Sequence, residues 1–152
     1  MRAFFEIGIY HSKSSENIGT LWRSAYQLGA SGIFTVGQRY KHQSSDTLKT
    51  YGHIPLRCYL SWEEFCAARP METQLIAIEI GGKPLSSFVH PQQAIYLLGA
   101  EDHGLPKNIL QACQHVIELE SARTPSYNVA VAGSLVMYQR LMQVKQQEGQ
   151  KL

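Results

Sequence analysis

The chain lacks several features that mark common classes of protein. It has no apolar run of about 18 residues, the length that a membrane-spanning helix needs. Its N-terminus carries Glu6 and no cleavage-site pattern of a signal peptide. Its three cysteines form no C-x-x-C pair, which argues against a disulfide framework or a zinc ribbon. We therefore expect a cytoplasmic protein with no membrane span and no metal site.

Motifs for common cofactors are missing as well. No G-x-G-x-x-G follows a candidate strand and no G-K-[ST] occurs, which disfavours a Rossmann-type dinucleotide site and phosphoryl transfer. The six histidines form no H-x-x-x-H pair, and only His103, in a glycine-bearing loop, is a candidate for a site role. The net charge of +2 at pH 7 is too small to indicate a nucleic-acid partner by itself.

The chain does have 152 residues with 44% hydrophobic side chains, enough for one domain with a core. Short apolar runs alternate with helical patterns along it. Candidate strands are residues 4–10, 32–36, 56–60, 74–80, 94–99 and 115–119, and candidate helices are 17–28, 61–69, 129–144 and a segment after Pro106. This alternation predicts an α/β fold with a mostly parallel sheet and helices on both faces. We expect residues 1–152 to form a single domain.

The C-terminal helical pattern has a polar start and two apolar stripes. Ser126 and Asn128, at its start, are residue types that favour helix N-caps. One stripe holds Val129, Ala132, Gly133, Val136, Met137, Leu141 and Val144, and the other holds Val131, Leu135, Tyr138 and Met142. Because a surface helix has a single apolar face, we expect this helix to be buried on two sides. The second side packs either on a partner subunit or in an ordinary core.

The first predicted helix opens with Asn17-x-Gly19-x-x-x-Arg23. Gly19 and Arg23 are four residues apart and therefore share one helical face. Arg23 lies off the apolar face, so its guanidinium is free to meet solvent or a ligand. The alternative is a surface arginine with a chance glycine nearby.

Loops follow three of the late strands, at residues 81–84, 99–106 and 120–125, and the first two carry glycines. Ligands of α/β sheets bind at the carboxyl ends of strands, so these loops together predict a site for a small organic ligand. In the middle loop, Gly99 permits a close approach of backbone to a ligand, and Glu101 places a carboxylate at the mouth. The alternative is a tight turn with solvated acids.

These three elements, in this order and spacing, resemble the three motifs of the ribose-2′-O-methyltransferases of the SPOUT superfamily, SpoU/TrmH type. The first is Asn17-x-Gly19-x-x-x-Arg23, the second is Leu98-Gly99-x-Glu101-x-x-Gly104-Leu105-Pro106, and the third is Ser126-Tyr127-Asn128-Val129. The resemblance covers nearly the whole chain. It implies a SPOUT fold with a deep trefoil knot near the C-terminus and a homodimer joined through the C-terminal helix.

The resemblance also implies an activity. An enzyme of this type transfers a methyl group from S-adenosylmethionine to a ribose 2′-hydroxyl of RNA, leaves S-adenosylhomocysteine and uses no metal. We expect tRNA rather than rRNA as the substrate, and no separate RNA-binding extension within the chain. The alternative is a non-catalytic RNA-binding or assembly protein on the same fold.

The resemblance assigns roles to individual residues. Those expected to contact S-adenosylmethionine are Ile78, Gly99, Leu119, Ser126 and Asn128, and those expected in the catalytic group are Arg23, Asn17, Glu101 and Asn128. Glu101 and Asn128 would order the site, and Asn17 would support Arg23 or contact an RNA phosphate. Arg23 would work at the reacting ribose, close to the donor bound by the other subunit.

Two accounts of Arg23 follow from its chemistry. It either loses a proton and acts as the base, or stays charged and stabilises the developing alkoxide while another group removes the proton. We favour the second, because the pKa of arginine is about 12 or higher.

The chain departs from the family pattern at several positions. The third motif usually reads S-L-N-V-S, so Tyr127 replaces a leucine and Ala130 replaces a serine whose hydroxyl would make a substrate or cap contact. The approach to this motif, Glu118-Leu119-Glu120, is more acidic than usual. The loop 41–45 is polar and basic, and is either a contact for tRNA phosphates or a solvated loop.

Overall fold

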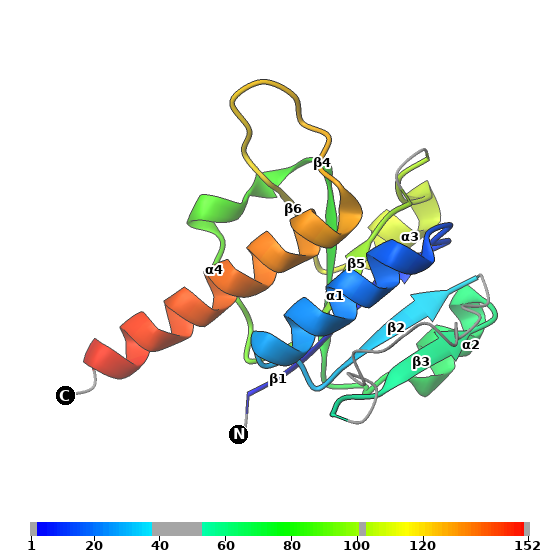
Figure 1. Cartoon of the computed structure of the whole chain (residues 1–152), viewed down its shortest axis with the longest axis horizontal. Coiled ribbons are helices and arrows are strands. Elements are labelled where there is room, and N and C mark those ends of the chain that lie inside the picture. The colour runs from blue at the N-terminus through cyan, green and yellow to red at the C-terminus, as the bar shows by residue number, and fades with distance from the viewer. Residues whose placement is uncertain (1–2, 38–52, 101–102, 151–152) are drawn as a thin grey trace.

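The computed structural model describes residues 3–37, 53–100 and 103–150. Six strands form one sheet in the order β3-β2-β1-β5-β4-β6, and every neighbouring pair is parallel (Figure 1). The strands are β1 (Phe4–Tyr10), β2 (Gly32–Val36), β3 (Leu56–Tyr59), β4 (Gln74–Pro84), β5 (Gln93–Leu98) and β6 (His115–Glu118). The predicted parallel sheet is confirmed, and the strands agree with the predicted ranges within one residue at each end, except that β4 runs four residues beyond its predicted end.

The helices follow the sequence pattern with small shifts at their ends. They are α1 (Ser15–Gln27), α2 (Trp62–Ala68), α3 (Lys107–Ala112) and α4 (Val129–Gln150), with the short 3-10 helix η2 (Leu85–Ser87) after β4. The helix α1 begins two residues earlier than predicted, because the Ser14 side chain accepts a hydrogen bond from the Asn17 amide at 3.2 Å and caps it.

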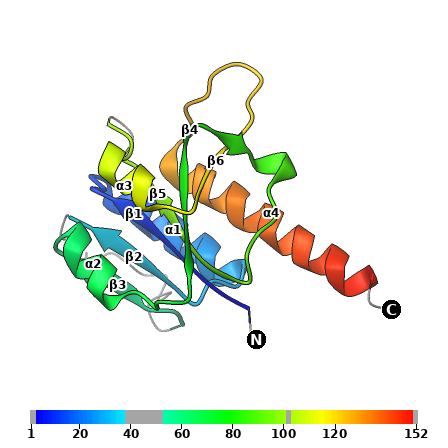
Figure 2. The same ribbon diagram turned by 180° about the vertical axis from the view of Figure 1, so that it is seen from behind.

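Two hydrophobic cores lie on the two faces of the sheet. The helices α1 and α4 cover one face, and α2 and α3 cover the other (Figures 1 and 2). Side chains alternate along each strand, so Ile7 and Ile9 of β1 pack in the first core, whereas Phe34 and Val36 of β2 pack in the second. The predicted helices on both faces are therefore confirmed.

The long helix α4 packs closely beside α1. A Cβ atom at Gly133 would lie 2.6 Å from the Leu21 side chain, so glycine is what permits this approach. Nearby, a hydrogen bond joins the hydroxyl oxygens of Ser134 and Ser24 at 2.9 Å. The helix extends six residues beyond the predicted end. In the described part of the chain, no helix is both long and apolar enough to cross a membrane.

The two predicted stripes of α4 have different environments. The first stripe packs against the sheet and α1, with Val136 and Met137 fully buried. The second stripe faces outward, and Val131, Leu135 and Tyr138 are 47%, 42% and 54% exposed. The chain's own core therefore does not cover the second stripe, and a partner subunit there stays a prediction.

One buried charge in α4 was not predicted. Arg140 is 4% exposed, and its guanidinium donates to the carbonyls of Pro91 and Gln92 at 2.7 and 3.1 Å and to the Tyr96 hydroxyl at 3.0 Å. The guanidinium also lies 4.8 Å from the centre of the Phe5 ring. These contacts fix α4 to the start of β5.

Candidate functional site

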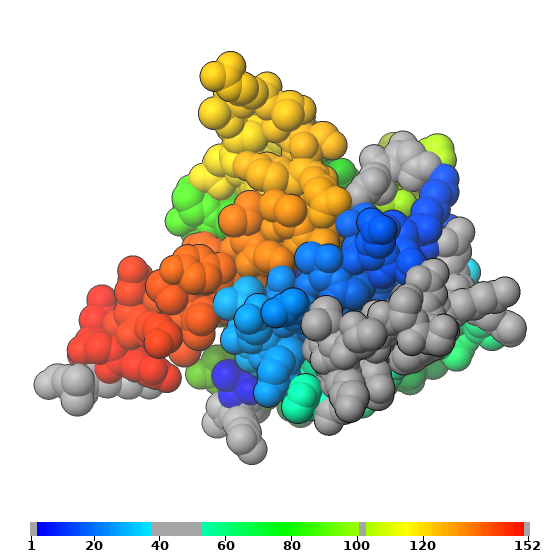
Figure 3. All heavy atoms as spheres, viewed as in Figure 1, coloured from blue at the N-terminus to red at the C-terminus, as the bar shows by residue number. Residues whose placement is uncertain are grey.

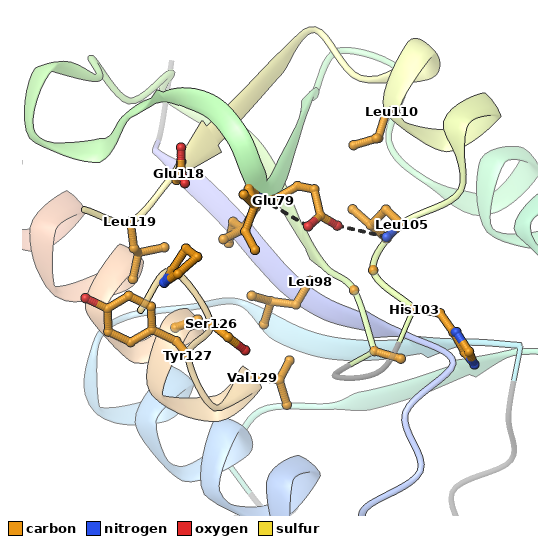
Figure 4. A pocket seen from close by; sticks show the side chains of 17 residues that line it. Glu79, Leu98, His103, Leu105, Leu110, Glu118, Leu119, Ser126, Tyr127 and Val129 are labelled. Atoms are coloured by element: carbon orange, nitrogen blue, oxygen red, sulfur yellow. Dashed lines mark hydrogen bonds between the residues drawn. The ribbon is translucent and has the colours of Figure 1, made fainter. Parts of the chain in front are cut away.

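A pocket of about 430 Å³ opens at the carboxyl ends of β4, β5 and β6 (Figure 4). Two of the three loops predicted from the sequence, 99–106 and 120–125, contribute to its wall, whereas no residue of the loop 81–84 lines it. Its lining includes Ile78, Glu79, Leu98, Gly99, Ala100, His103, Gly104, Leu105, Glu118, Leu119, Ser126, Tyr127 and Val129. Four of the predicted donor contacts, Ile78, Gly99, Leu119 and Ser126, thus lie around one cavity although they are distant in sequence.

The wall combines apolar side chains with backbone and acidic groups. Leu98, Leu119 and Val129 supply apolar surface, and Glu79 and Glu118 supply carboxylates (Figure 4). His103, the single histidine singled out from the sequence, lies at the exposed edge of the wall. Apolar walls with few polar groups are typical of pockets for small organic ligands.

The second motif forms a tight loop at one side of the pocket. The Ala100 carbonyl accepts the Gly104 amide at 3.0 Å, which closes the loop on itself. Gly104 has a φ of 63°, a conformation that favours glycine. A Cβ atom at Gly99 would lie 2.7 Å from the Gly104 backbone, so the two glycines are in contact. Glu101 lies outside the described residues.

The first and third motifs meet through two asparagines. The Asn128 side-chain amide donates to the Asn17 side-chain oxygen at 3.0 Å. The Asn128 oxygen accepts from the amides of Ala130 and Val131 at 2.9 and 3.1 Å, and therefore caps α4. Of the two predicted caps, Asn128 makes the contact, while Ser126 lies in the pocket wall.

A second cavity of about 320 Å³ lies at the start of α1. Asn17 lines it together with Ser12, Lys13 and Ser14, and it shares Ala100 and Val129 with the larger pocket. The two cavities therefore adjoin. The free amides at the start of a helix favour negatively charged groups, so this cavity suits an anion or a polar substituent.

Arg23 is exposed on α1 and is not among the residues that line either cavity. Asn17 and Arg23 are six residues apart on the helix, so they point in different directions. Within one protomer, the structure thus brings Asn17 to the pocket but not Arg23.

The departures from the family pattern have visible contacts. The carboxylate of Glu118 accepts the Gly81 amide at 3.2 Å, and that of Glu120 accepts the Ser86 amide at 3.2 Å. Hydrogen bonding from Ser86 lowers the pKa of the exposed Glu120 carboxyl. The Tyr127 hydroxyl donates to the Glu120 carbonyl at 2.6 Å. The acidic approach and Tyr127 together hold the segment after β6 to the end of β4.

Ala130 lies in the first turn of α4 and is 1% exposed. Its amide donates to Asn128, and its carbonyl accepts the Ser134 hydroxyl at 2.7 Å. Asn128 supplies the cap, so α4 is capped although Ala130 lacks the hydroxyl of the usual serine. The basic loop 41–45, predicted as a contact for tRNA phosphates or a solvated loop, lies outside the described residues.

Sequence reasoning missed Glu79, which lies in β4 one residue after the pairing with β5 ends. Its carboxylate accepts the Leu105 amide at 2.9 Å and so contacts the second motif. A single acid in the apolar run Leu75–Ile80 was the available signal.

In the described part of the chain, no group of three or more His, Cys, Asp or Glu side chains could hold a metal ion.

Solved structures share this fold. One, described as "Structural insights into the 2-OH methylation of C/U34 on tRNA", has a TM-score of 0.83 at 23% identity over 94% of this chain and 97% of its own. AviRb, a SpoU methyltransferase from Streptomyces viridochromogenes in complex with AdoMet, has a TM-score of 0.79 at 22% identity over 95% of this chain and 59% of its own. The TrmH/SpoU tRNA modifying enzyme of A. aeolicus has a TM-score of 0.82 at 14% identity over 97% of this chain and 78% of its own.

At these identities the likeness establishes the fold. No curated protein sequence matches the chain. The SpoU rRNA Methylase family, however, matches residues 5–138, which is most of the chain. The chain belongs to the SpoU rRNA Methylase family.

Proposed function

We propose that the chain is an RNA methyltransferase that uses S-adenosylmethionine and methylates a ribose 2′-hydroxyl. One observation carries the proposal: residues of all three motifs gather at two adjoining cavities, joined by the hydrogen bond between Asn17 and Asn128. Two cavities side by side suit a reaction in which a group passes between two bound molecules.

The larger pocket fits the donor. Ile78, Leu98 and Leu119 offer apolar surface for an adenine, and Gly99 brings backbone close enough for polar contacts. Ser126 adds a further polar group to the wall. When bound, S-adenosylmethionine supplies a methyl group activated by a positively charged sulfur.

The smaller cavity suits the RNA. Its lining by Lys13, Asn17 and the start of α1 favours a ribose with its phosphate. Asn128 holds the Asn17 side chain in place while it caps α4, so Asn128 is an ordering residue in this proposal. Glu101 keeps the ordering role that the resemblance gives it.

We further propose a homodimer in which Arg23 of one protomer completes the site of the other. Two observations support this arrangement. Arg23 does not line the cavities of its own protomer, and the helices α1 and α4 lie side by side on one face of the molecule (Figure 3). The exposed stripe of Val131, Leu135 and Tyr138 on α4 supplies an apolar surface that a second copy would cover.

In the dimer, Arg23 stays charged and stabilises the negative charge that develops on the 2′-oxygen. A guanidinium presents several donors in a fixed plane, which suits an oxygen that is also near a phosphate. In the alternative, Arg23 loses its own proton, which costs much more free energy because the pKa of arginine is high.

The knot is also a proposal. The strand β6 lies at the edge of the sheet beside β4, yet α4, which follows it, packs on α1 over the centre of the sheet. The connecting segment lines the larger pocket together with the loop after β5, and its Glu120 carboxylate accepts the Ser86 amide in η2, after β4. We propose that this segment passes through one of those loops and forms the trefoil knot.

We favour tRNA over rRNA, because the structure described with tRNA methylation is of nearly the same length as this chain. A protein that binds RNA without catalysis is the alternative.

Two measurements test the proposal. Calorimetric titration with S-adenosylmethionine distinguishes the enzyme from the non-catalytic alternative. The enzyme should bind the donor, and absence of binding would support the non-catalytic protein. Incubation of unmodified tRNA and rRNA with labelled donor, followed by mapping of 2′-O-methyl groups, then identifies the substrate. Methylation of a base instead of a ribose would contradict the proposal.

A further inference from the structure

We propose that Glu79 is a positioning residue that braces the second-motif loop against β4 and so holds the shape of the donor pocket. The inference rests on the proposed function for the identity of the ligand. Its structural part, the brace itself, stands on contacts of Glu79 with neighbouring backbone and does not depend on any ligand.

Both carboxylate oxygens of Glu79 are used. One oxygen accepts the Leu105 amide at 2.9 Å, and the other accepts the Ile80 amide at 3.0 Å (Figure 4). The first contact joins two segments that are 26 residues apart in sequence, the middle of β4 and the loop after β5. The second contact fixes the direction of the side chain one residue after Ile78, where the pairing of β4 with β5 ends. Both oxygens of the Glu79 carboxylate are thus held.

The glycines of the loop fit around this carboxylate. A Cβ atom at Gly104 would lie 2.6 Å from the Glu79 oxygen that accepts the Leu105 amide. Gly99 in turn touches the backbone of Gly104, where a Cβ atom would come within 2.7 Å. Glu79, Gly104 and Gly99 are therefore packed in a row, and all three line the donor pocket.

The arrangement explains why the residue is an acid. A carboxylate offers two acceptor oxygens to two amide donors, and bonds from a backbone amide to a charged acceptor are among the stronger ones. A glutamine would turn one NH2 group toward an amide donor. Without the brace, the Leu105 amide loses its partner, and the loop is held by its own closing bond between Ala100 and Gly104.

The first test compares donor affinity in Glu79→Ala, Glu79→Gln and a matched control. Glu64 is the control, because its carboxylate also accepts a backbone amide, that of Leu60 at 3.0 Å, but on the helix α2 away from the pocket. We expect the Kd for S-adenosylmethionine to rise at least ten-fold in Glu79→Ala and by an intermediate factor in Glu79→Gln. Glu64→Ala should change it less than two-fold.

The same titrations with S-adenosylhomocysteine separate the brace from a charge effect. The product lacks the positive sulfur, so a brace predicts that Glu79→Ala weakens donor and product by the same factor. Weakening of the donor alone would mean that the charge of Glu79 acts on the sulfur, and would overturn the proposal. So would equal affinities in Glu79→Ala and Glu64→Ala.

The second test needs no ligand. We expect hydrogen exchange at the Leu105 amide, followed by NMR, to speed up at least ten-fold in Glu79→Ala, while the amide of Ile7 in β1 is unchanged. Unchanged exchange at Leu105 would overturn the brace whatever the affinities are. If the wild-type protein fails to bind S-adenosylmethionine, the proposed function falls, and exchange still decides on the brace. If Glu79→Ala fails to fold, Glu79→Gln carries both measurements.

Discussion

The start and the middle of α4 both carry polar side chains in contact with distant parts of the chain, and they differ in what surrounds those contacts. At the start, Asn128 caps the helix and holds Asn17, beside two cavities that are open to ligands. In the middle, Arg140 is enclosed, and its bonds go to carbonyls and to a buried hydroxyl. The first arrangement leaves room for a ligand, whereas the second only holds the helix in place.

The polar groups around Arg140 are hydrogen-bonded to one another. The Tyr96 hydroxyl accepts from Arg140 and is 2.6 Å from Nδ1 of His90. The other ring nitrogen of His90 bonds to the Gln139 side chain, whose NH2 group donates to the Leu85 carbonyl at 3.2 Å. The difference between the two parts of α4 is therefore one of exposure: the enclosed Arg140 only supports the fold, whereas the exposed Asn128 lies beside the cavities of the candidate site.

The largest effect is expected at Arg140. Arg140→Ala leaves two buried carbonyls and the Tyr96 hydroxyl without their donor, and it opens a cavity, so we expect a loss of about 3 kcal/mol in the free energy of unfolding. Urea unfolding measures it, with the exposed Lys145→Ala on the same helix as control. Binding of S-adenosylmethionine by the folded variant should change little. If the free energy of S-adenosylmethionine binding fell by as much as the free energy of unfolding, Arg140 would not be a purely structural residue, and the contrast with the start of α4 would be wrong.

The second largest effect is expected on the methylation rate, with little change in the free energy of unfolding. Arg23→Lys keeps the charge but loses the forked guanidinium, so we expect the methylation rate to drop about 100-fold, equivalent to about 2.7 kcal/mol in the transition state. Because Arg23 is exposed, the free energy of unfolding should stay within about 0.5 kcal/mol of wild type. Single-turnover methylation of the identified RNA measures the rate. Full activity would contradict any role for the guanidinium.

A smaller effect separates the two functions of Asn128. Asn128→Ala removes the cap and should cost about 1 kcal/mol of stability. Asn128→Asp keeps an oxygen for the cap but cannot donate to Asn17, so its stability should stay near wild type while the methylation rate falls. Thermal unfolding and the methylation assay are compared for both variants. Equal rates in Asn128→Asp and wild type would show that the bond to Asn17 has no catalytic consequence.

The smallest effect near neutral pH involves His90. Burial lowers its pKa from 6.5 to about 4, so the unfolded chain binds a proton in this interval and the folded chain does not. Its contribution to stability is therefore complete above pH 6.5 and is lost as the pH falls toward 4. Urea unfolding at several pH values should give a shallower decline over this interval for His90→Gln than for wild type. Parallel declines would contradict the enclosed, neutral imidazole.

The central strands β1, β2 and β5 were predictable because they are buried on both faces and so read as continuous apolar runs. The end of β4 was not, because the strand pairs with β6 again after an irregularity between Ile78 and Lys83 and continues to Pro84. Pairing of this kind depends on the neighbouring strand, which a local pattern does not reveal.

The site was predictable where it rests on motifs, as at Gly99 and Ser126, and was missed where it rests on a contact between segments, as at Glu79. Arg140 was missed for a related reason. Arg140 continues the buried face of α4 after Val136 and Met137. A charged side chain at such a position is buried only when distant groups accept its hydrogen bonds, and here these are the carbonyls of Pro91 and Gln92.

The bond between Asn17 and Asn128 spans 111 positions of the chain, and this separation bears on how the protein is made. During synthesis the first helix emerges early, and its partner asparagine follows only 111 positions later. Contacts between such distant segments form late and slow the folding of a chain. Neither cavity can acquire its full wall before Val129, at the start of α4, has left the ribosome, so a growing chain should be unable to complete either cavity until that point.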